Sequence, residues 1–231
     1  MAPRFALYLA PPPDHPLHTF AAGWLGWDPE RGLAFAPKAE AGLDAERIAA
    51  LTVEPRRYGF HGTLKPPFRL REDCDEAQLI IAIERFAATR RPIALPVLKL
   101  ASIGRFLALC PSAPCEEIDA LAADCVRDFD RFRAPPSEQE LARRRAATLS
   151  ARQERYLQQW GYPYVMEEFR LHFTLTGRIA DAAEHEALQR YLTKATERFT
   201  RKSMTIDEIC LFVQPAPDAN FRIAGRYRFA G

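Results

Sequence analysis

Residues 56–70 read RRYGFHGTLKPPFRL, and their central four letters, H-G-T-L at residues 61–64, have a counterpart late in the chain. The second copy is H-F-T-L at residues 172–175, inside EEFRLHFTLTGRI at residues 167–179. Side chains of a β-strand alternate between its two faces, so residues two apart point the same way. Each copy therefore predicts a strand with polar residues on one face and apolar residues on the other.

The polar faces of the two predicted strands carry similar side chains. On the first strand the polar face carries His61, Thr63 and Lys65, and on the second it carries Arg170, His172, Thr174 and Thr176. A strand of this kind covers a hydrophobic core with one face and forms the floor of a cleft with the other. One H-x-T alone is more often structural than catalytic, and its repetition is what favours a functional interpretation.

Two such strands side by side would bring two imidazoles and at least two hydroxyls into one cleft. Imidazole titrates near neutral pH, so one histidine can be neutral while the other is protonated. A neutral imidazole can take a proton from an attacking water or hydroxyl, and an imidazolium can protonate the departing oxygen of a phosphodiester. Threonine hydroxyls, with Lys65 or Arg170 nearby, could hold the non-bridging oxygens. The residues do not indicate which histidine is the base.

The composition is that of an ordinary soluble globular protein, with 48% hydrophobic and 27% charged residues. A formal net charge of +2 indicates that any positive potential is local rather than a coat for nucleic acid. The five cysteines include no C-x-x-C pair, and no H-E-x-x-H or clustered carboxylates occur, so we expect neither a metal nor a cofactor. No leader or membrane-spanning run is expected, and reduced thiols favour the cytoplasm.

The hydrophobic pattern predicts strands and helices in alternation. Strands are expected at residues 4–11, around the first motif, in a hairpin about Gly104, at 168–178, 206–214 and 221–229, and helices at 17–27, 42–52, 75–90, 116–132, 138–160 and 182–200. This order predicts an α+β fold of one domain, 1–231, made of two pseudo-twofold lobes (1–110 and 111–231). Each lobe would hold a small antiparallel sheet with helices outside, and the catalytic cleft would lie between them. The helix at 137–160 is expected as an insertion.

Four further residues are candidates for the rim of the cleft. Arg57 and Tyr58 precede the first motif, and they either begin a surface strand or contact phosphate and base. Arg144 lies in the run 143–145, which is either a solvated helix face or a positive lid over an anionic substrate. Tyr8 alternates with the apolar residues Leu7 and Leu9 along its predicted strand, so it points to the opposite face and could face the cleft. His15, His18 and His185 lack the motif and are expected to be surface or packing residues.

Two H-x-T-hydrophobic motifs on strands of two similar lobes resemble the 2H phosphoesterase superfamily. The chain is similar in particular to a bacterial branch named for phosphonate metabolism, a domain of unknown function, in stretches such as RFALYLAPP, WLGWDPERG and QWGYPYV. The resemblance covers essentially the whole chain. It implies a bilobal fold and a catalytic set of His61, Thr63, His172 and Thr174. The helix carrying residues 143–145 looks like an insertion relative to the smallest members, so their substrates need not transfer.

The resemblance implies a metal-independent phosphoesterase acting on a cyclic phosphodiester of a small nucleotide or ribosyl phosphate, such as 5-phosphoribosyl 1,2-cyclic phosphate in phosphonate breakdown. One alternative is an enzyme of RNA ends, a 2′-5′ ligase or exonuclease, which the near-neutral charge disfavours. Another is a non-catalytic protein that binds a phosphorylated metabolite. The expected partner is a small phosphorylated substrate, with no membrane and no obligate protein partner.

Overall fold

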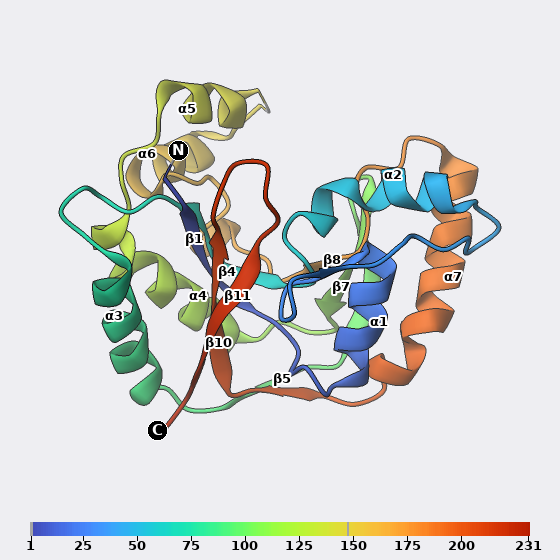
Figure 1. Ribbon diagram of the computed structural model, residues 1–231, viewed down its shortest axis with the longest axis horizontal. Helices are drawn as coiled ribbons and strands as arrows, with labels where there is room; N and C mark the ends of the chain where they lie inside the picture. The colour runs from blue at the N-terminus through green and yellow to red at the C-terminus, as the bar shows by residue number, and fades with distance from the viewer. Residues whose placement is uncertain (1, 147) are drawn as a thin grey trace.

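A single antiparallel sheet organises the computed structural model, which describes residues 2–146 and 148–231 (Figure 1). Within these residues seven strands follow the order β11-β10-β1-β4-β8-β7-β6. Their bounds are β1 Arg4–Leu9, β4 Gly62–Phe68, β6 Leu98–Ile103, β7 Phe106–Pro111, β8 Phe173–Thr174, β10 Glu208–Gln214 and β11 Arg222–Arg228. Two small sheets pair β2 (Trp27–Asp28) with β3 (Leu33–Ala34), and β5 (Ile93–Leu95) with β9 (Met204–Ile206).

The two faces of the sheet differ in how they are covered. On β1, Phe5, Leu7 and Leu9 enter the main hydrophobic core, and residues 209, 211 and 213 of β10 do the same. The alternate residues Ala6 and Tyr8 belong to a second, smaller cluster, which they share with Cys210, Phe212 and Phe221. The period-2 pattern of the sequence thus separates a helix-covered core face from a face that remains available for a site.

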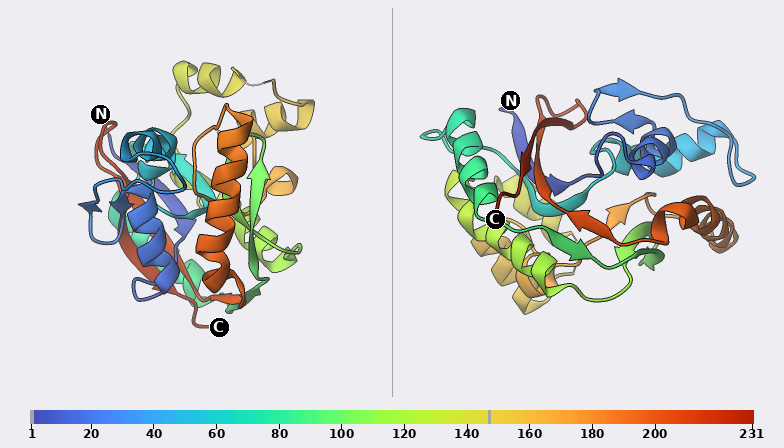
Figure 2. Two further views of the ribbon diagram at one scale, coloured as in Figure 1. Left: turned by 90° about the vertical axis from the view of Figure 1, so that its right-hand side faces the viewer. Right: turned by 90° about the horizontal axis from the view of Figure 1, so that it is seen from below.

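Seven α-helices accompany the sheet within the described residues. Their bounds are α1 Pro16–Leu25, α2 Ala45–Arg56, α3 Glu76–Ala88, α4 Glu116–Asp128, α5 Glu138–Arg145, α6 Ala151–Trp160 and α7 Ala182–Thr200, with 3-10 turns η1 Asp130–Phe132 and η2 Met166–Glu168. Helices α3 and α4 lie beside one end of the sheet, and α1 and α7 pack together at the other (Figures 1 and 2). The expected α+β class with antiparallel strands and outer helices is confirmed.

The order of the strands differs from a simple division of the chain near residue 110. Strands β10 and β11, from the end of the chain, continue the half of the sheet that holds β1 and β4. On the other side β7 pairs with β8 and β6 pairs with β7, although β6 and β7 come from the first half of the chain. Each half of the sheet therefore combines strands from both parts of the sequence. In one half β1 pairs with β10, and in the other β7 pairs with β8.

The segment expected as one helix at 138–160 contains two helices, α5 and α6. Each begins with its own capping box. Ser137 caps α5 together with Glu140, and Ser150 caps α6 together with Gln153. A serine whose hydroxyl accepts from the third backbone N–H starts a new helix, so Ser150 marks an N-terminus that the longer helical pattern concealed.

The second motif strand is shorter than the expected 168–178, since β8 comprises only Phe173–Thr174. Beyond it the backbone still follows β7, with Leu175 N donating to Leu107 O (2.9 Å) and Ile179 N to Arg105 O (2.8 Å). Gly177 N turns instead to Leu51 O in α2 (2.6 Å). Because the backbone here bonds to two different elements, the regular ladder ends at Thr174.

None of the helices found in residues 2–146 and 148–231 has both the length and the apolar character that crossing a lipid bilayer requires.

Candidate active site

The two motif strands lie next to each other at the centre of the sheet. Gly62 of β4 is the antiparallel partner of Phe173 of β8. The two strands run in opposite directions from this pair. His61 therefore lies opposite Thr174, and Thr63 lies opposite His172. Each histidine thus faces the threonine of the other motif, on the side of the sheet opposite to the buried Phe173.

Gly62 makes this close pairing possible. A Cβ at this position would lie 2.7 Å from Leu171 Cδ1 and 3.1 Å from two ring atoms of Phe173. Carbon atoms do not approach one another to 2.7 Å, so a larger residue would push the two strands apart. The glycine between His61 and Thr63 is therefore part of the geometry that brings the motifs together.

Both histidines are oriented by the same local hydrogen bond. His61 Nδ1 donates to the carbonyl oxygen of Gly59 at 2.9 Å, and His172 Nδ1 donates to that of Arg170 at 2.8 Å. A carbonyl can only accept, so Nδ1 carries the proton in each ring and Nε2 of a neutral ring is free to act as a base. The repeat extends beyond the motif letters, since each ring bonds the carbonyl two residues before it.

His61 is surrounded by aromatic rings. Tyr8 stacks on it with ring centroids 4.0 Å apart, and Tyr58 lies at 5.6 Å. Burial is the main cause that lowers the pKa of His61 to about 4, and the positive charge of His172 lowers it further. The hydrogen bond that His61 donates to the Gly59 carbonyl favours the charged form and opposes both effects. His61 is consequently neutral at pH 7, so that one member of the pair is prepared to accept a proton.

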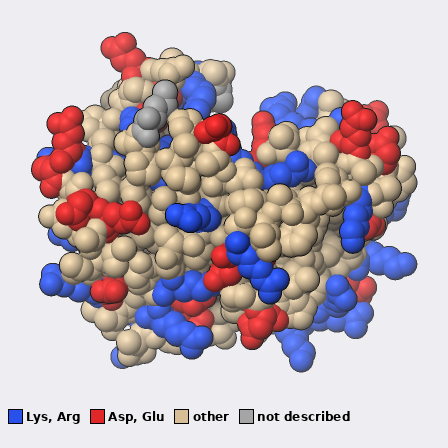
Figure 3. All heavy atoms as spheres, in the orientation of Figure 1, with Lys and Arg blue, Asp and Glu red and all other residues tan. Residues whose placement is uncertain are grey.

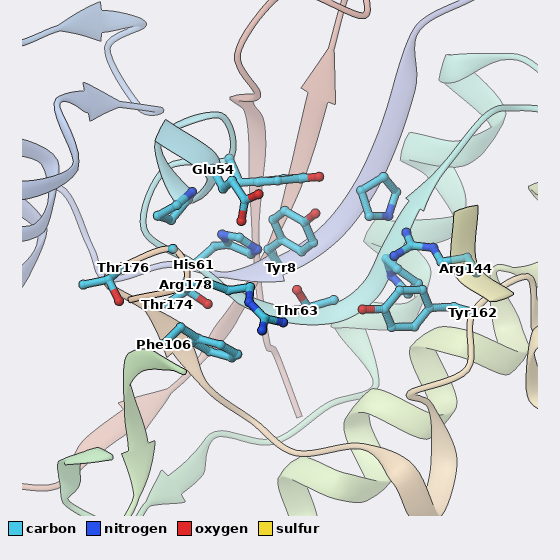
Figure 4. A pocket seen from close by; sticks show the side chains of 15 residues that line it. Tyr8, Glu54, His61, Thr63, Phe106, Arg144, Tyr162, Thr174, Thr176 and Arg178 are labelled. Carbon is cyan, nitrogen blue, oxygen red and sulfur yellow. The ribbon is translucent and has the colours of Figure 1, made fainter. Parts of the chain in front are cut away.

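A pocket of about 270 Å³ opens over this centre (Figure 4). Its lining includes His61, Thr63 and Thr174 of the motifs. The surface is notched between the part that carries α5 and the part that carries α2, and charges of both signs are scattered over the same face (Figure 3). His172 does not itself line the pocket; its ring lies 5.9 Å from that of Phe106, which does.

The rim candidates have different positions. Tyr8, Tyr58 and Arg144 line the pocket, and Arg144 Cζ lies 4.6 Å from the centre of the Tyr162 ring. Arg57 does not line it: its Nη2 donates to the carbonyl oxygen of Pro217 in the loop before β11. The side chain of Arg170 is exposed and does not line the pocket either, so that the residue contributes its backbone carbonyl to the site.

The expectation that Lys65 shares the cleft face is wrong. Its side chain is 2% exposed, with Nζ donating to Val126 O (3.1 Å) and lying 3.6 Å from Asp130 Oδ1. The pairing with β1 explains this, since Tyr8 pairs with Thr63 but Leu7 pairs with Lys65. One extra residue on β4 forms a bulge, which reverses the alternation and turns Lys65 toward the core face.

The sequence interpretation missed several residues of the pocket. They are Glu54 and Pro55 of α2, Pro66, Pro67, Phe106, Tyr162, Gly177 and Arg178. Arg178 is an even number of residues from His172 and Thr174, so extending the alternation of strand faces would have placed it on the same face. Glu54, Phe106 and Tyr162 come from other elements, and no local pattern marks them. Thr176 lines the pocket but is buried, and its hydroxyl accepts from Leu107 N (3.0 Å).

The other three histidines have structural contacts, as expected. His15 Nδ1 accepts from Leu17 N (3.2 Å) and caps α1. His18 is buried with its Nε2 3.1 Å from Asp28 Oδ1, and His185 Nε2 lies 3.2 Å from Ser102 Oγ.

Comparisons with known proteins give relatives of two kinds. The chain is 38% identical over 235 residues to the ribose 1,5-bisphosphate phosphokinase PhnN of Janthinobacterium sp. (strain Marseille), covering 99% of this chain and 51% of that protein. It is 33% identical over 223 residues to the protein of the same name from Laribacter hongkongensis (strain HLHK9), covering 95% and 50%. The chain thus spans about half the length of these curated relatives. It is also similar to the crystal structure of E. coli LigT complexed with NADP+, with a TM-score of 0.46, 13% identity and full coverage of both chains.

The model of one protein family, described as a protein of unknown function (DUF1045), matches residues 63–222. The match begins at Thr63 and includes His172 and Thr174. It confirms the part of the sequence resemblance that points to a domain of unknown function, and the chain belongs to the DUF1045 family.

Proposed function

We propose that this chain is a metal-independent phosphoesterase that hydrolyses a cyclic phosphodiester of a small nucleotide or ribosyl phosphate. The observation that carries the proposal is the crossed pairing of the two motifs, which sets each histidine against the threonine of the other. The pairing places two imidazoles and two hydroxyls on neighbouring positions of β4 and β8. A phosphorus atom with an attacking and a departing oxygen needs groups of those kinds on both sides.

In this proposal His61 is the general base and His172 the general acid. The pKa of His61, lowered to about 4 chiefly by burial, keeps its Nε2 unprotonated at neutral pH. It would remove a proton from the attacking water as the P–O bond forms. His172, as imidazolium, would give its Nε2 proton to the departing sugar oxygen as the other P–O bond breaks. A phosphomonoester is the product.

The non-bridging oxygens would be held by Thr63, Thr174 and Arg178. The two hydroxyls and the guanidinium line the pocket together, and Figure 4 shows the Arg178 side chain extending between Thr174 and Thr63. Donors placed before the reaction stabilise the negative charge that develops in the transition state without reorganising. In this proposal Arg178 takes the role that the sequence interpretation gave to Lys65 or Arg170.

A ribosyl substrate is supported by two independent features. The curated relatives are named for a kinase of a ribose phosphate. The pocket also offers aromatic rings from Tyr8, Tyr58 and Phe106, against which a sugar or base can pack. Together with the resemblance to the branch named for phosphonate metabolism, this leads us to propose phosphonate breakdown as the setting.

The test is a screen of the purified protein, with EDTA present, against a panel of cyclic phosphates followed by phosphorus NMR. We expect His61→Ala and His172→Ala each to lower kcat by about 10²-fold or more, as loss of acid or base catalysis does. The matched control is His185→Ala, which removes a histidine bonded to Ser102 outside the pocket and should keep full activity.

The outcomes also separate the alternatives. Turnover by both motif variants at the wild-type rate would rule out the proposed mechanism. RNA binding with a steep dependence on salt, together with trimming or joining of RNA ends, would favour an enzyme of RNA ends instead. Tight binding of a cyclic phosphate without product after long incubation would indicate a binding protein.

A further inference from the structure

A second cavity adjoins the pocket where the α5–α6 segment meets β1 and β4. Its volume is about 40 Å³, and five of the residues that line it are arginines. They are Arg4, Arg69, Arg133, Arg143 and Arg144, and we call this space the arginine cavity. A cluster of five guanidinium groups is unusual in a chain whose formal net charge is only +2, since like charges repel at short range.

Two of these arginines are neutralised by carboxylates. Arg69 makes a bidentate pair with Glu140, with both N–O distances 2.8 Å. Arg133 makes bonds of 2.7 and 3.3 Å to the two oxygens of Asp130. These pairs fix the walls of the cavity, whose lining includes Glu140 itself, while Asp130 also lies 3.6 Å from Lys65 Nζ.

The other three arginines retain their charge. Arg4 Nε donates to Gln214 Oε1 at 2.7 Å, and that acceptor is neutral. Among the described residues no carboxylate lies within ion-pair distance of Arg143 or Arg144. Burial lowers the pKa of Arg4, and the charges of Arg57 and Arg143 add to this effect. The cavity is therefore a place where an anion would gain three partners.

The arginine cavity lies next to the pocket over the histidines and shares part of its wall. Pro67 and Arg144 line both spaces. Figure 4 shows Arg144 and Tyr162 at one end of the pocket, with Thr174, Thr176 and Phe106 at the other end and His61 between them. Arg144 thus stands at the border of both spaces, where a ligand that reaches from one to the other would meet it.

The size and chemistry of the cavity fit one phosphate group. A water-sized group needs about 10–15 Å³ of such space, so about 40 Å³ has room for about three, the number of terminal oxygens on a phosphomonoester. Guanidinium groups bind phosphate through paired N–H donors, and several around one anion give both strength and orientation. A neutral sugar or base edge would leave these charges unpartnered.

We propose that the arginine cavity binds a phosphomonoester that belongs to the same substrate whose cyclic phosphodiester lies over the histidines. The substrate class is accordingly a sugar or nucleoside cyclic phosphate that carries a second, terminal phosphate. This inference rests on the proposed function for the cyclic group, but the cavity itself can be tested without turnover. Arg143 and Arg144 of α5 are then the residues that select for the second phosphate.

The first experiment compares adenosine 2′,3′-cyclic phosphate with the same compound carrying a 5′-phosphate. We expect kcat/KM to be at least about tenfold higher for the 5′-phosphorylated compound, as charge-assisted hydrogen bonds to an added phosphate would give. Arg143→Gln should lower that ratio about tenfold. Arg145→Gln is the matched control on the same helix, because Arg145 pairs with Glu154 and does not line the cavity, and it should leave the ratio unchanged.

The second experiment measures binding of ribose 5-phosphate by isothermal titration calorimetry. We expect His61→Ala to bind it as wild type does and Arg143→Gln to bind it about tenfold more weakly. Equal turnover of both cyclic compounds, or binding that ignores Arg143, would overturn the cavity proposal while leaving the phosphoesterase proposal intact. Arginine-dependent binding without turnover of either cyclic compound would support the cavity and contradict the proposed reaction.

Discussion

At the scale of single residues, the enclosure of His61 determines its protonation. The imidazole lies against Tyr8 and near Tyr58, with a carbonyl on one nitrogen and a second histidine close enough to oppose its charge. Burial and the charge of His172 favour the neutral ring, and the carbonyl bond opposes them. The neutral imidazole that the proposed mechanism needs is obtained here from packing rather than from a neighbouring carboxylate.

The lowered pKa of His61 predicts a specific dependence of stability on pH. Between its ordinary value of 6.5 and about 4, the unfolded chain binds a proton that the native protein does not. The free energy of unfolding should therefore fall as pH decreases through this range, by about 1–3 kcal/mol from this residue. Urea denaturation at pH 7 and pH 4.5 should show a smaller loss for His61→Gln than for wild type. An equal loss of unfolding free energy in both proteins would contradict the lowered pKa of His61.

Substitution of Thr63 and Lys65 distinguishes the observed site from the one expected from alternation. Thr63→Val should lower kcat/KM for the cyclic phosphate about tenfold, since it removes one charge-stabilising donor. Lys65→Met should leave kcat/KM within about threefold of wild type, because Lys65 faces the core. Its stability should be unchanged or increased, since Asp130 keeps Arg133 as a partner. Steady-state kinetics on both variants tests this prediction. An equal loss of kcat/KM in both variants would indicate that Lys65 contacts the substrate.

At the scale of secondary-structure elements, the site depends on how closely β4 and β8 approach each other. Their pairing is short, and it has a glycine on one strand and a phenylalanine on the other. The strands flanking them, β1 and β7, pair over longer stretches and hold them in place. A small disturbance at the β4–β8 junction should therefore affect both histidines at once.

Gly62→Ala should destabilise the protein by about 1–3 kcal/mol, because the new methyl group would meet Leu171 and Phe173 below contact distance. Activity should fall as well, since separation of the strands moves the two motifs apart. The matched control is Gly23→Ala in α1, where no atom lies within 4 Å of the added Cβ. Removing a glycine from that helix should stabilise the protein by about 0.5–1 kcal/mol. Urea denaturation of the two variants tests both values, and wild-type stability in Gly62→Ala would contradict the close packing.

The helices illustrate which features of an element are local. The capping residues Asp75, Ser137 and Asp181 lie at the starts of α3, α5 and α7, close to the predicted starts. Ser150 is an equally good cap, but it lies within a polar segment whose spacing resembles one continuous helix. The spacing of apolar residues indicates that a segment can be helical, whereas a capping residue within the segment determines where a helix begins.

At the scale of the whole molecule, one sheet connects both halves of the polypeptide. The main hydrophobic core includes residues of β1, β4, β7, β8 and β10, together with α1, α3, α4 and α7. The pocket and the arginine cavity both lie on this shared framework, and the arginine cavity is completed by the α5–α6 segment. The two motifs therefore cannot separate without disturbing the common core.

This continuity predicts a single cooperative unfolding transition. Differential scanning calorimetry should give one peak with equal calorimetric and van't Hoff enthalpies, as for a two-state domain. Addition of a cyclic phosphate should raise the midpoint temperature through preferential binding to the native state. Two resolved transitions would show instead that the lobes fold as separate units.

The sequence by itself determined the strand character of both motifs, their polar and apolar faces, and most of the helices, because these follow from the alternation and capping of neighbouring residues. Only the tertiary structure decided the direction of Lys65, the order of the strands, and the arrival of Glu54, Phe106, Tyr162 and Arg144 at one pocket. A bulge exists only relative to the strand that pairs with it, and a pocket wall depends on packing between distant segments. Neither the bulge nor the pocket wall produces a periodic pattern in the sequence of the residues involved.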